Sequence, residues 1–305
     1  MKAFVTGGAG FIGSHLVEEL LSQGIKVHII DNLSTGKKEN IHPDAVFHNM
    51  DVRDAELINV FLKEKPDIVF HLSAQVDVQR SIADPVYDAM VNIVGTVNVL
   101  RACRESGVKK IIYSSTSAVY GDLDTPKLME HDINIPVSYY GLSKYTPEHY
   151  LRIFSSLYGL SYTVLRYANV YGPKQTAKGE GGVIAIFLDR MKKDLPLLIH
   201  GNGLQTRDFI YVKDIVSANI SAMQLANNET INISTGHSIS VNKLADILED
   251  LHGKELDIFY GQARPGDIMH SCLDNEKAGK VLNWAPEYTV EEGLSATYQF
   301  VMKKS

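Results

Sequence analysis

The sequence predicts an α/β protein with a doubly wound parallel sheet and a smaller α/β domain attached to it. Three observations predict this class. Short runs rich in Val, Ile and Phe alternate with amphipathic stretches as far as about residue 165. Such continuously apolar runs are typical of strands covered on both faces, and strand–helix alternation joins parallel strands through helical crossovers. The length of 305 residues reaches the size at which single hydrophobic cores tend to divide.

The first half supplies the elements of the sheet. A further strand is expected just before Asp51. The other expected strands, most of them bounded by Gly, Pro or Asp, are Ala3–Thr6, Lys26–Ile30, Asp67–Leu72, Lys109–Ser114 and Ser161–Leu165. The expected helices between them are Ser14–Ser22, Ala55–Glu64, Pro85–Ser106 and Tyr139–Leu157.

The alternation of strand and helix patterns becomes less regular after about residue 170, where Gly and Pro cluster in short segments. The expected helices there are Val183–Lys192, Val212–Ala226, Val241–Leu251 and Val290–Phe300, with a short strand at Leu197–Ile199. We therefore expect one domain over residues 1–170 and a second over 171–305. Some later segments are expected to return to the first domain.

Composition excludes several functional classes. The net charge of −6 and the scattered Lys pairs argue against a nucleic-acid partner. No apolar run approaches the roughly 18 residues of a membrane span, and a strand begins where a signal peptide would lie. Two cysteines suit a reducing compartment, so a cytoplasmic protein is expected. The 11 histidines are dispersed, and no metal site is expected.

A glycine-rich loop follows the first strand directly. It runs from Gly7 to Gly13 with the sequence Gly-Gly-Ala-Gly-Phe-Ile-Gly, and a helix follows it. Glycines permit a tight turn and close backbone approach, and the N-terminus of the helix favours a pyrophosphate. The second strand ends in Asp31, 18 residues past Gly13. An acid there can bind both ribose hydroxyls of an adenosine and repel a 2′-phosphate, which predicts NAD rather than NADP.

A tyrosine and a lysine could share one face of a later helix. Tyr140 and Lys144 stand four residues apart, which is one helical turn. A lysine cation favours the phenolate and lowers a pKa that is about 10 in model peptides. The run from Tyr113 to Gly121 ends a strand in hydroxyl side chains, one of which could bridge the phenol and a substrate oxygen. The pair alone is a common accident of sequence, so the argument depends on its combination with the other motifs.

Together these motifs resemble the extended short-chain dehydrogenase/reductase superfamily, and within it the UDP-glucose 4-epimerase family. The resemblance covers nearly the whole chain. Its later motifs are Leu165-Arg-Tyr-Ala-Asn169-Val-Tyr-Gly172-Pro173, Arg207-Asp208-Phe-Ile-Tyr211-Val-Lys-Asp214 and Arg264-Pro-Gly-Asp267. The resemblance implies a Rossmann-type sheet, a tightly bound NAD and a reaction without net redox change.

In that family the catalytic hydroxyl lies three residues before Val-Tyr-Gly, which falls on Thr116; many members carry Ser there. The resemblance implies that Thr116 bonds the sugar O4, Tyr140 takes the 4′-hydroxyl proton and Lys144 holds the nicotinamide ribose. The implied cofactor contacts are Gly7, Gly10, Phe11, Ile12, Gly13, Asp31, Asn32, Ser34, Gly36, Asp51, Val52, Leu72, Ser73, Ala74, Gln75, Asn92, Ser114, Tyr140, Lys144, Tyr167 and Val170. The implied substrate contacts are Thr116, Tyr140, Asn169, Val183, Arg207, Arg264, Asp267 and Ser271.

Related chemistries remain open on this scaffold. Dehydratases carry an Asp-Glu pair after the catalytic Thr, whereas Ser117 and Ala118 stand here, which argues against dehydration. A uronate substrate, for a 4-epimerase or a decarboxylase, is disfavoured because no cation for its carboxylate is identified. A net oxidoreductase, or an NAD-sensing protein without activity, are the remaining alternatives. His71 at a strand end is at least as readily a buried structural histidine as a ligand contact.

Two further expectations follow from the resemblance. A position four residues past Asp267 controls the width of the sugar pocket, and Ser271 there should admit 2-acetamido sugars. The helices Pro85–Ser106 and Tyr139–Leu157 correspond to those through which relatives dimerise, so a homodimer is expected. Apolar residues at helical spacing on the first of these helices are compatible with that role, although they would also serve the core of a monomer.

Overall fold

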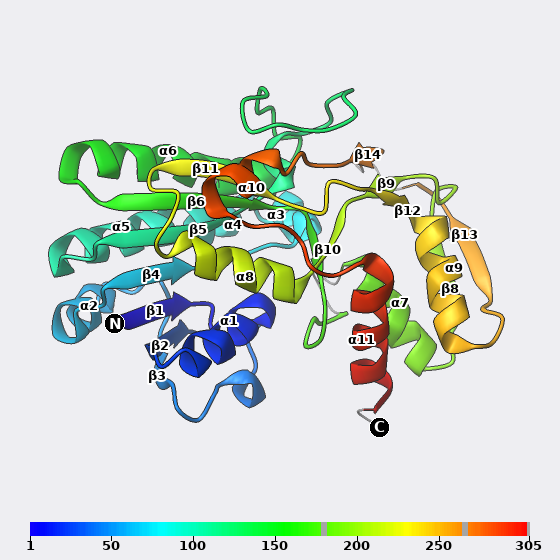
Figure 1. The fold of residues 1–305 in the computed structure, drawn as a ribbon, viewed down its shortest axis with the longest axis horizontal. Helices are drawn as coiled ribbons and strands as arrows, with labels where there is room; N and C mark the ends of the chain where they lie inside the picture. The colour runs from blue at the N-terminus through cyan, green and yellow to red at the C-terminus, as the bar shows by residue number, and fades with distance from the viewer. Residues whose placement is uncertain (178–181, 264–267, 304–305) are drawn as a thin grey trace.

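The computed structural model describes residues 1–177, 182–263 and 268–303. Among these residues, seven strands form one parallel sheet in the order β11-β6-β5-β4-β1-β2-β3 (Figure 1). The strands are β1 (Lys2–Thr6), β2 (Lys26–Asp31), β3 (Val46–Asn49), β4 (Ile68–His71), β5 (Lys110–Thr116), β6 (Ser161–Tyr167) and β11 (Glu229–Ile233). The doubly wound fold class predicted from the sequence is confirmed.

Helices cover both faces of this sheet, and each face has its own hydrophobic core. One core contains side chains of α1 (Phe11–Ser22), α8 (Val212–Ala222) and α10 (Glu276–Leu282). The other contains side chains of α2 (Leu57–Glu64), α5 (Gly95–Ser106) and α6 (Tyr139–Tyr158). Because both faces are buried, the strands read as continuous apolar runs, as the sequence pattern indicated.

The expected helix Pro85–Ser106 is interrupted. The segment begins as α4 (Pro85–Ala89), widens into one π-helical turn (Met90–Val94) and continues as α5. A short helix, α3 (Val78–Ala83), precedes it with Asp77 as the N-cap. A π-turn inserts an extra residue into a helix and is frequent at functional sites. Here it coincides with Asn92, whose buried side chain bonds the segment that follows β4.

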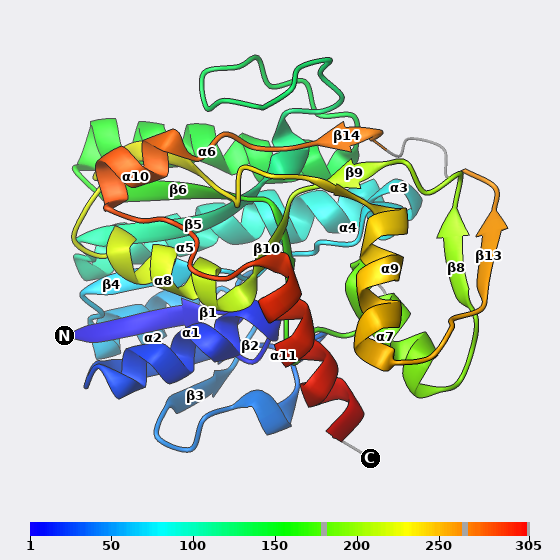
Figure 2. The same ribbon diagram turned by 45° about the vertical axis from the view of Figure 1, so that its right-hand side comes forward.

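The second half of the chain divides between two places. Part of it returns to the large sheet, because β11 pairs with β6 and α8 packs against α1. The rest forms a smaller lobe with a third hydrophobic core, on the right in Figure 2. The helices of this lobe are α7 (Val183–Lys192), α9 (Val241–His252) and α11 (Val290–Lys303). The division at residue 170 stays a prediction. The segments that return to the large sheet are Val212–Ile233 and α10, which packs against α8 and β11.

Short strands outside the large sheet form small sheets of their own, and β8 and β13 lie at the outer edge of the lobe (Figure 2). They pair as β7 with β10, β8 with β13, and β9 between β12 and β14. Their bounds are β7 (Asn169–Tyr171), β8 (Leu197–His200), β9 (Thr206–Arg207), β10 (Phe209–Tyr211), β12 (Ile239–Ser240), β13 (Ile258–Gly261) and β14 (His270–Ser271). Two short 3₁₀ turns, Lys38–Asn40 and Ser117–Val119, complete the elements. In the described part of the chain, no helix is long and apolar enough to cross a membrane.

Candidate active site

The carboxyl ends of the parallel strands open into one large cavity of about 730 Å³. It lies where β1 and β4 are neighbours and their crossovers leave toward opposite sides, the place where such sheets bind ligands. The smaller lobe forms the opposite wall, through residues such as Phe187, Ile199 and Arg207. The cavity therefore spans from the glycine-rich loop to the second half of the chain.

The glycine-rich loop is shaped by its lack of side chains. Gly7 adopts a left-handed φ of +72°, and a Cβ there would lie 2.9 Å from the Ser73 nitrogen. A Cβ on Gly13 would lie 2.1 Å from the Gly7 carbonyl oxygen. The loop thus packs backbone on backbone, and Gly10 precedes the first turn of α1. This leaves the N-terminus of the helix facing the cavity, which suits a phosphate.

Asp31 ends β2 with a buried carboxylate. It accepts hydrogen bonds from the Ala9 nitrogen at 3.0 Å and the Leu33 nitrogen at 2.8 Å. Burial raises the pKa of this carboxyl, and the two backbone bonds oppose that rise. Gly36 packs beside it, since a Cβ on Gly36 would meet the Asp31 Oδ1 at 2.7 Å. Asp31 therefore lines the cavity as a fixed acceptor, whereas Gly36 does not itself line it.

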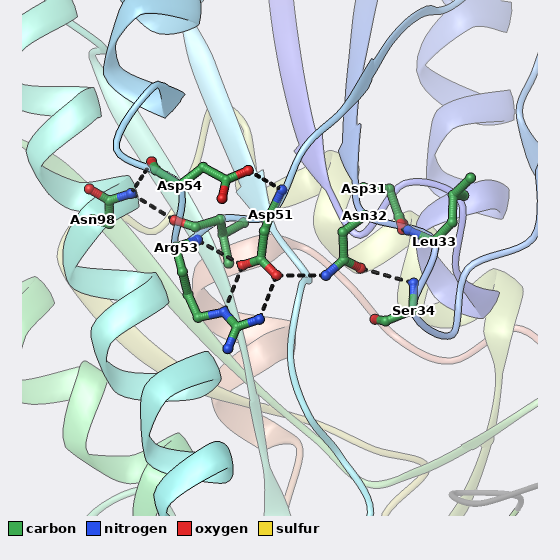
Figure 3. Close-up of polar contacts among 9 residues, drawn as sticks. Asp31, Asn32, Leu33, Ser34, Asp51, Arg53, Asp54 and Asn98 are labelled. Atoms are coloured by element: carbon green, nitrogen blue, oxygen red, sulfur yellow. Dashed lines mark hydrogen bonds and ion pairs between the residues drawn. The ribbon is translucent and has the colours of Figure 1, made fainter.

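A second acid, Asp51, is oriented by neighbours on both sides (Figure 3). Arg53 donates to Oδ1 from Nε at 2.8 Å and to Oδ2 from Nη2 at 2.7 Å, and Asn32 donates to Oδ2 at 2.7 Å. The bond from Arg53 lowers the Asp51 carboxyl pKa to about 2, so the group is ionised at neutral pH. Asn98 of α5 holds this turn by donating to the Val52 and Asp54 carbonyls. Asp51, Val52, Asn32 and Ser34 all line the cavity.

The three predicted catalytic residues line the same cavity. Thr116 ends β5, and Tyr140 and Lys144 lie one turn apart near the start of α6. Ser138 caps that helix by accepting from the Gly141 nitrogen at 3.1 Å. The Tyr140 nitrogen donates to the Ser81 Oγ at 3.2 Å, which fixes this end of the helix against α3.

Lys144 is buried although it borders the cavity. Its Nζ lies 4.5 Å from the centre of the Tyr113 ring. Burial lowers the pKa of its ammonium to about 7, and the carboxylates of Glu148 and Asp88 oppose that fall. A cation in this position favours ionisation of a neighbouring phenol. Tyr140 lies one helical turn before this cation and lines the same cavity.

A buried network behind the cavity wall holds His71 and Asn92. His71 bonds the Thr6 hydroxyl at 2.7 Å and the Thr96 hydroxyl at 2.9 Å, and burial lowers its pKa to about 3. The structural interpretation of this histidine is therefore favoured. Asn92 bonds the Gln75 backbone at both its nitrogen and its oxygen, and it also donates to the Ser143 Oγ at 2.8 Å. It supports the cavity wall from behind and does not line it.

The predicted substrate contacts divide into three groups. Asn169, Val183 and Arg207 line the cavity. Ser271 lies in β14, in register with Arg207 of β9, and borders a separate depression of about 590 Å³ rather than the main cavity. Arg264 and Asp267 lie outside the described residues.

All the remaining predicted cofactor contacts line the cavity. They are Gly7, Gly10, Phe11, Ile12, Gly13, Leu72, Ser73, Ala74, Gln75, Ser114, Tyr167 and Val170. The sequence reasoning missed Arg80, Tyr87, His200 and Gln205, which also line the cavity. The guanidinium of Arg80 lies over the Tyr87 ring at 4.1 Å. The helices and strands that carry these four residues were predicted only in part. None of the four stands at a characteristic sequence spacing from the recognised motifs, so the sequence held no signal for them.

The residues of the cavity fit a dinucleotide. The loop has no room for a Cβ at Gly7 or Gly13, so its backbone is exposed to a ligand at the start of α1. Asp31 ends β2 18 residues past Gly13, which is about the spacing at which an acid bonds the adenosine ribose in such folds. Gly10, Asp31, Asp51 and Lys144 would hold NAD, which supplies a hydride acceptor and donor when bound.

The fold and the site together define a Rossmann-type enzyme of the extended short-chain dehydrogenase/reductase class, with a Tyr–Lys pair beside an NAD cradle. The family model "NAD dependent epimerase/dehydratase family" matches residues 3–234. The chain belongs to this family, and NAD is its cofactor.

Individual relatives extend this result along the whole chain. The UDP-glucose 4-epimerase of Mycolicibacterium smegmatis is 38% identical over 315 residues, covering 100% of both chains. The crystal structure of UDP-glucose 4-epimerase from Thermotoga maritima with UDP-glucose is 44% identical, with a TM-score of 0.98 over 100% of this chain and 99% of that one. A UDP-N-acetylglucosamine 4-epimerase from Methanobrevibacter ruminantium, in complex with UDP-N-acetylmuramic acid, is 38% identical with a TM-score of 0.95, over 100% and 99% of the two chains.

Proposed function

We propose that the protein catalyses the NAD-dependent 4-epimerisation of a UDP-hexose. One observation carries the proposal: Thr116, Tyr140 and Lys144 share a cavity with the glycine-rich loop at one end and Arg207 at the other. A cavity with both a dinucleotide cradle and a cation for a second diphosphate suits a nucleotide-sugar as substrate. The relatives named UDP-sugar 4-epimerases support this substrate class.

The chain's own residues perform the proton transfers in this proposal. Tyr140 takes the proton of the sugar 4′-hydroxyl as C4 is oxidised to a ketone, and returns it after the sugar has turned over. The Lys144 cation, one helical turn from Tyr140, favours the phenolate form of the tyrosine. Thr116 bonds O4 so that the hydroxyl lies within reach of Tyr140. The cofactor is restored in each cycle, which removes any need for it to leave.

Tyr140→Phe tests the assignment of the acid–base group. We expect turnover to fall by about 10²- to 10⁴-fold, the usual contribution of general acid–base catalysis. Tyr139→Phe is the matched control, because Tyr139 is the adjacent tyrosine and 52% exposed. Turnover of UDP-galactose that is equal in both variants contradicts the assignment.

For the sugar, we propose UDP-glucose and UDP-galactose as substrates, with UDP-GlcNAc and UDP-GalNAc also accepted. The relative named UDP-N-acetylglucosamine 4-epimerase supports the wider range. Ser271 is small and is the register partner of Arg207, which lines the cavity, although Ser271 itself borders the separate depression. Ser271→Tyr should reduce turnover of the N-acetylated sugars more than that of UDP-glucose. Undiminished N-acetylated turnover in that variant shows that Ser271 does not control the width.

We further propose that the protein is a homodimer. The outer face of α4, the π-turn and α6 exposes apolar side chains, among them Val86, Ile153 and Leu157. Exposed apolar side chains on neighbouring helices are typical of protein interfaces, and α6 packs against both α4 and the π-turn. Ile153→Glu should give a monomer in light scattering, whereas Leu62→Glu on α2, also exposed, should not change the mass. A wild-type mass of one chain overturns the proposal.

A further inference from the structure

One buried carboxylate beside the site has no part in the proposed chemistry. Glu148 lies one helical turn past Lys144 on α6 and is 8% exposed. Buried carboxylates are costly unless they are paired and hydrogen-bonded. The hydrogen-bond partners of the Glu148 carboxylate therefore explain how its charge is accommodated inside the protein.

Glu148 connects α6 to the ends of two strands. The Ser115 hydroxyl donates to its Oε1 at 2.5 Å, and Ser115 directly precedes Thr116. Arg166 of β6 donates to Oε1 from Nε at 3.1 Å and to Oε2 from Nη2 at 2.7 Å. Ser115 and Arg166 are register partners on β5 and β6. One carboxylate thus ties the helix that carries Tyr140 and Lys144 to the strand that ends in Thr116.

Arg166 is itself held by aromatic rings. Its guanidinium lies 4.8 Å from the centre of the Tyr120 ring, and the Tyr120 hydroxyl donates to the Asn232 Oδ1 at 2.7 Å. Arg166 is 3% exposed, so the pair with Glu148 lies fully inside the protein. Replacing a buried ion pair by apolar groups is often neutral for the free energy of unfolding. A contribution to stability therefore does not by itself explain why this ion pair is present.

The same carboxylate also faces the catalytic lysine. Lys144 is surrounded by Glu148 on its own helix, Asp88 of α4, the Tyr113 ring of β5 and the neutral His71 of β4. The two carboxylates favour its charged form, and burial opposes it. Tyr140 lies one turn before it on the same helix.

We propose that Glu148 is a positioning residue of the reaction: it fixes Thr116 relative to Tyr140 and places a carboxylate one helical turn from Lys144. It acts through Ser115 and Lys144 rather than on the substrate. This inference rests on the proposed function, because its kinetic effect is measured on epimerisation.

The test compares three variants. Glu148→Gln keeps the size of the side chain and removes its charge. The double variant Glu148→Leu/Arg166→Met removes both charges, so that no buried ion is left without a partner. Glu64→Gln is the matched control, because Glu64 forms an ion pair with Lys2 at 3.0 Å outside the residues that line the cavity.

We expect kcat to fall about 10- to 100-fold in both Glu148 variants, since a displacement of about 1 Å costs up to 10²-fold. KM should stay within about twofold, because Glu148 does not line the cavity. The alkaline limb of the kcat–pH profile should move to lower pH, as Lys144 loses its proton earlier. Glu64→Gln should retain the wild-type profile.

A second readout does not require turnover. Nitrogen-15 NMR of labelled lysine side chains, with Lys144 assigned by its loss in Lys144→Met, should give a lower pKa for Lys144 in Glu148→Gln than in the wild type. A folded double variant with wild-type kcat, pH profile and Lys144 pKa overturns the inference. A wild type that converts no UDP-sugar refutes the proposed function instead, and the NMR result still reports on Glu148.

Discussion

Gly13→Ala is the sharpest perturbation of the cofactor cradle. The added Cβ would lie 2.1 Å from the Gly7 carbonyl oxygen and 2.8 Å from the Gly8 Cα. Ordinary carbon–oxygen contacts begin at about 3.3 Å, so the loop and α1 must separate by roughly 1 Å. Both contacting atoms are backbone, so no side chain can rotate away. Overpacking of this kind costs about 1–3 kcal/mol.

This cost should appear in cofactor binding. When this free-energy cost is borne by the NAD-bound protein, the affinity for NAD drops about 5- to 150-fold, because each 1.4 kcal/mol corresponds to a factor of ten. The assay measures the NAD that copurifies with the protein, released by acid and quantified against protein. We expect a loss of bound NAD together with a lower unfolding temperature.

Gly279→Ala is the matched control. Gly279 lies within α10, and a Cβ there would approach nothing nearer than the Trp284 carbonyl at 3.8 Å. Alanine in a helix interior should stabilise the protein by about 0.5–1 kcal/mol and leave NAD content unchanged. A Gly13→Ala protein with full NAD content and wild-type unfolding refutes the steric account of the loop.

Two further predictions concern stability. Because His71 is neutral in the folded state down to a pKa of about 3 and titrates near 6.5 when unfolded, the unfolded state binds more protons below pH 6.5. His71 alone should therefore lower the free energy of unfolding by about 2 kcal/mol between pH 7 and pH 5, and urea titrations that agree at both pH values contradict this. Asn92→Leu should cost about 1–3 kcal/mol, because the Gln75 backbone loses both of its bonds to Asn92; an unchanged urea midpoint contradicts that reasoning.

Local patterns in the sequence predicted most of the large sheet and its loop. The apolar runs gave β1, β2, β4, β5 and β6, and the glycines between the first strand and helix predicted the phosphate cradle. These features depend on neighbours within a few residues. The pairing of Tyr140 with Lys144 is also a local feature, because residues four apart on a helix lie on the same face.

Other features depend on contacts that no local pattern encodes. The strand Glu229–Ile233 was not predicted, because its place at the sheet edge follows from pairing with β6. The π-turn near Asn92 needs the Gln75 backbone as partner. Glu148 and Arg166 are separated by 18 residues and meet only once α6 has packed on the sheet. Ser271 was placed by one motif, and the structure sets it beside a different depression.

The fate of the hydrogen on C4 of the sugar tests whether the protein epimerises through a transient ketone with hydride returned to the same sugar. Purified protein with no added NAD is incubated with UDP-galactose that carries deuterium at C4, and the products are separated and analysed by mass and NMR. Parallel incubations use UDP-GlcNAc and UDP-glucuronate. We expect UDP-glucose that retains the deuterium at C4. An unchanged sugar, a net-oxidised product or UDP-glucose without the label would contradict it.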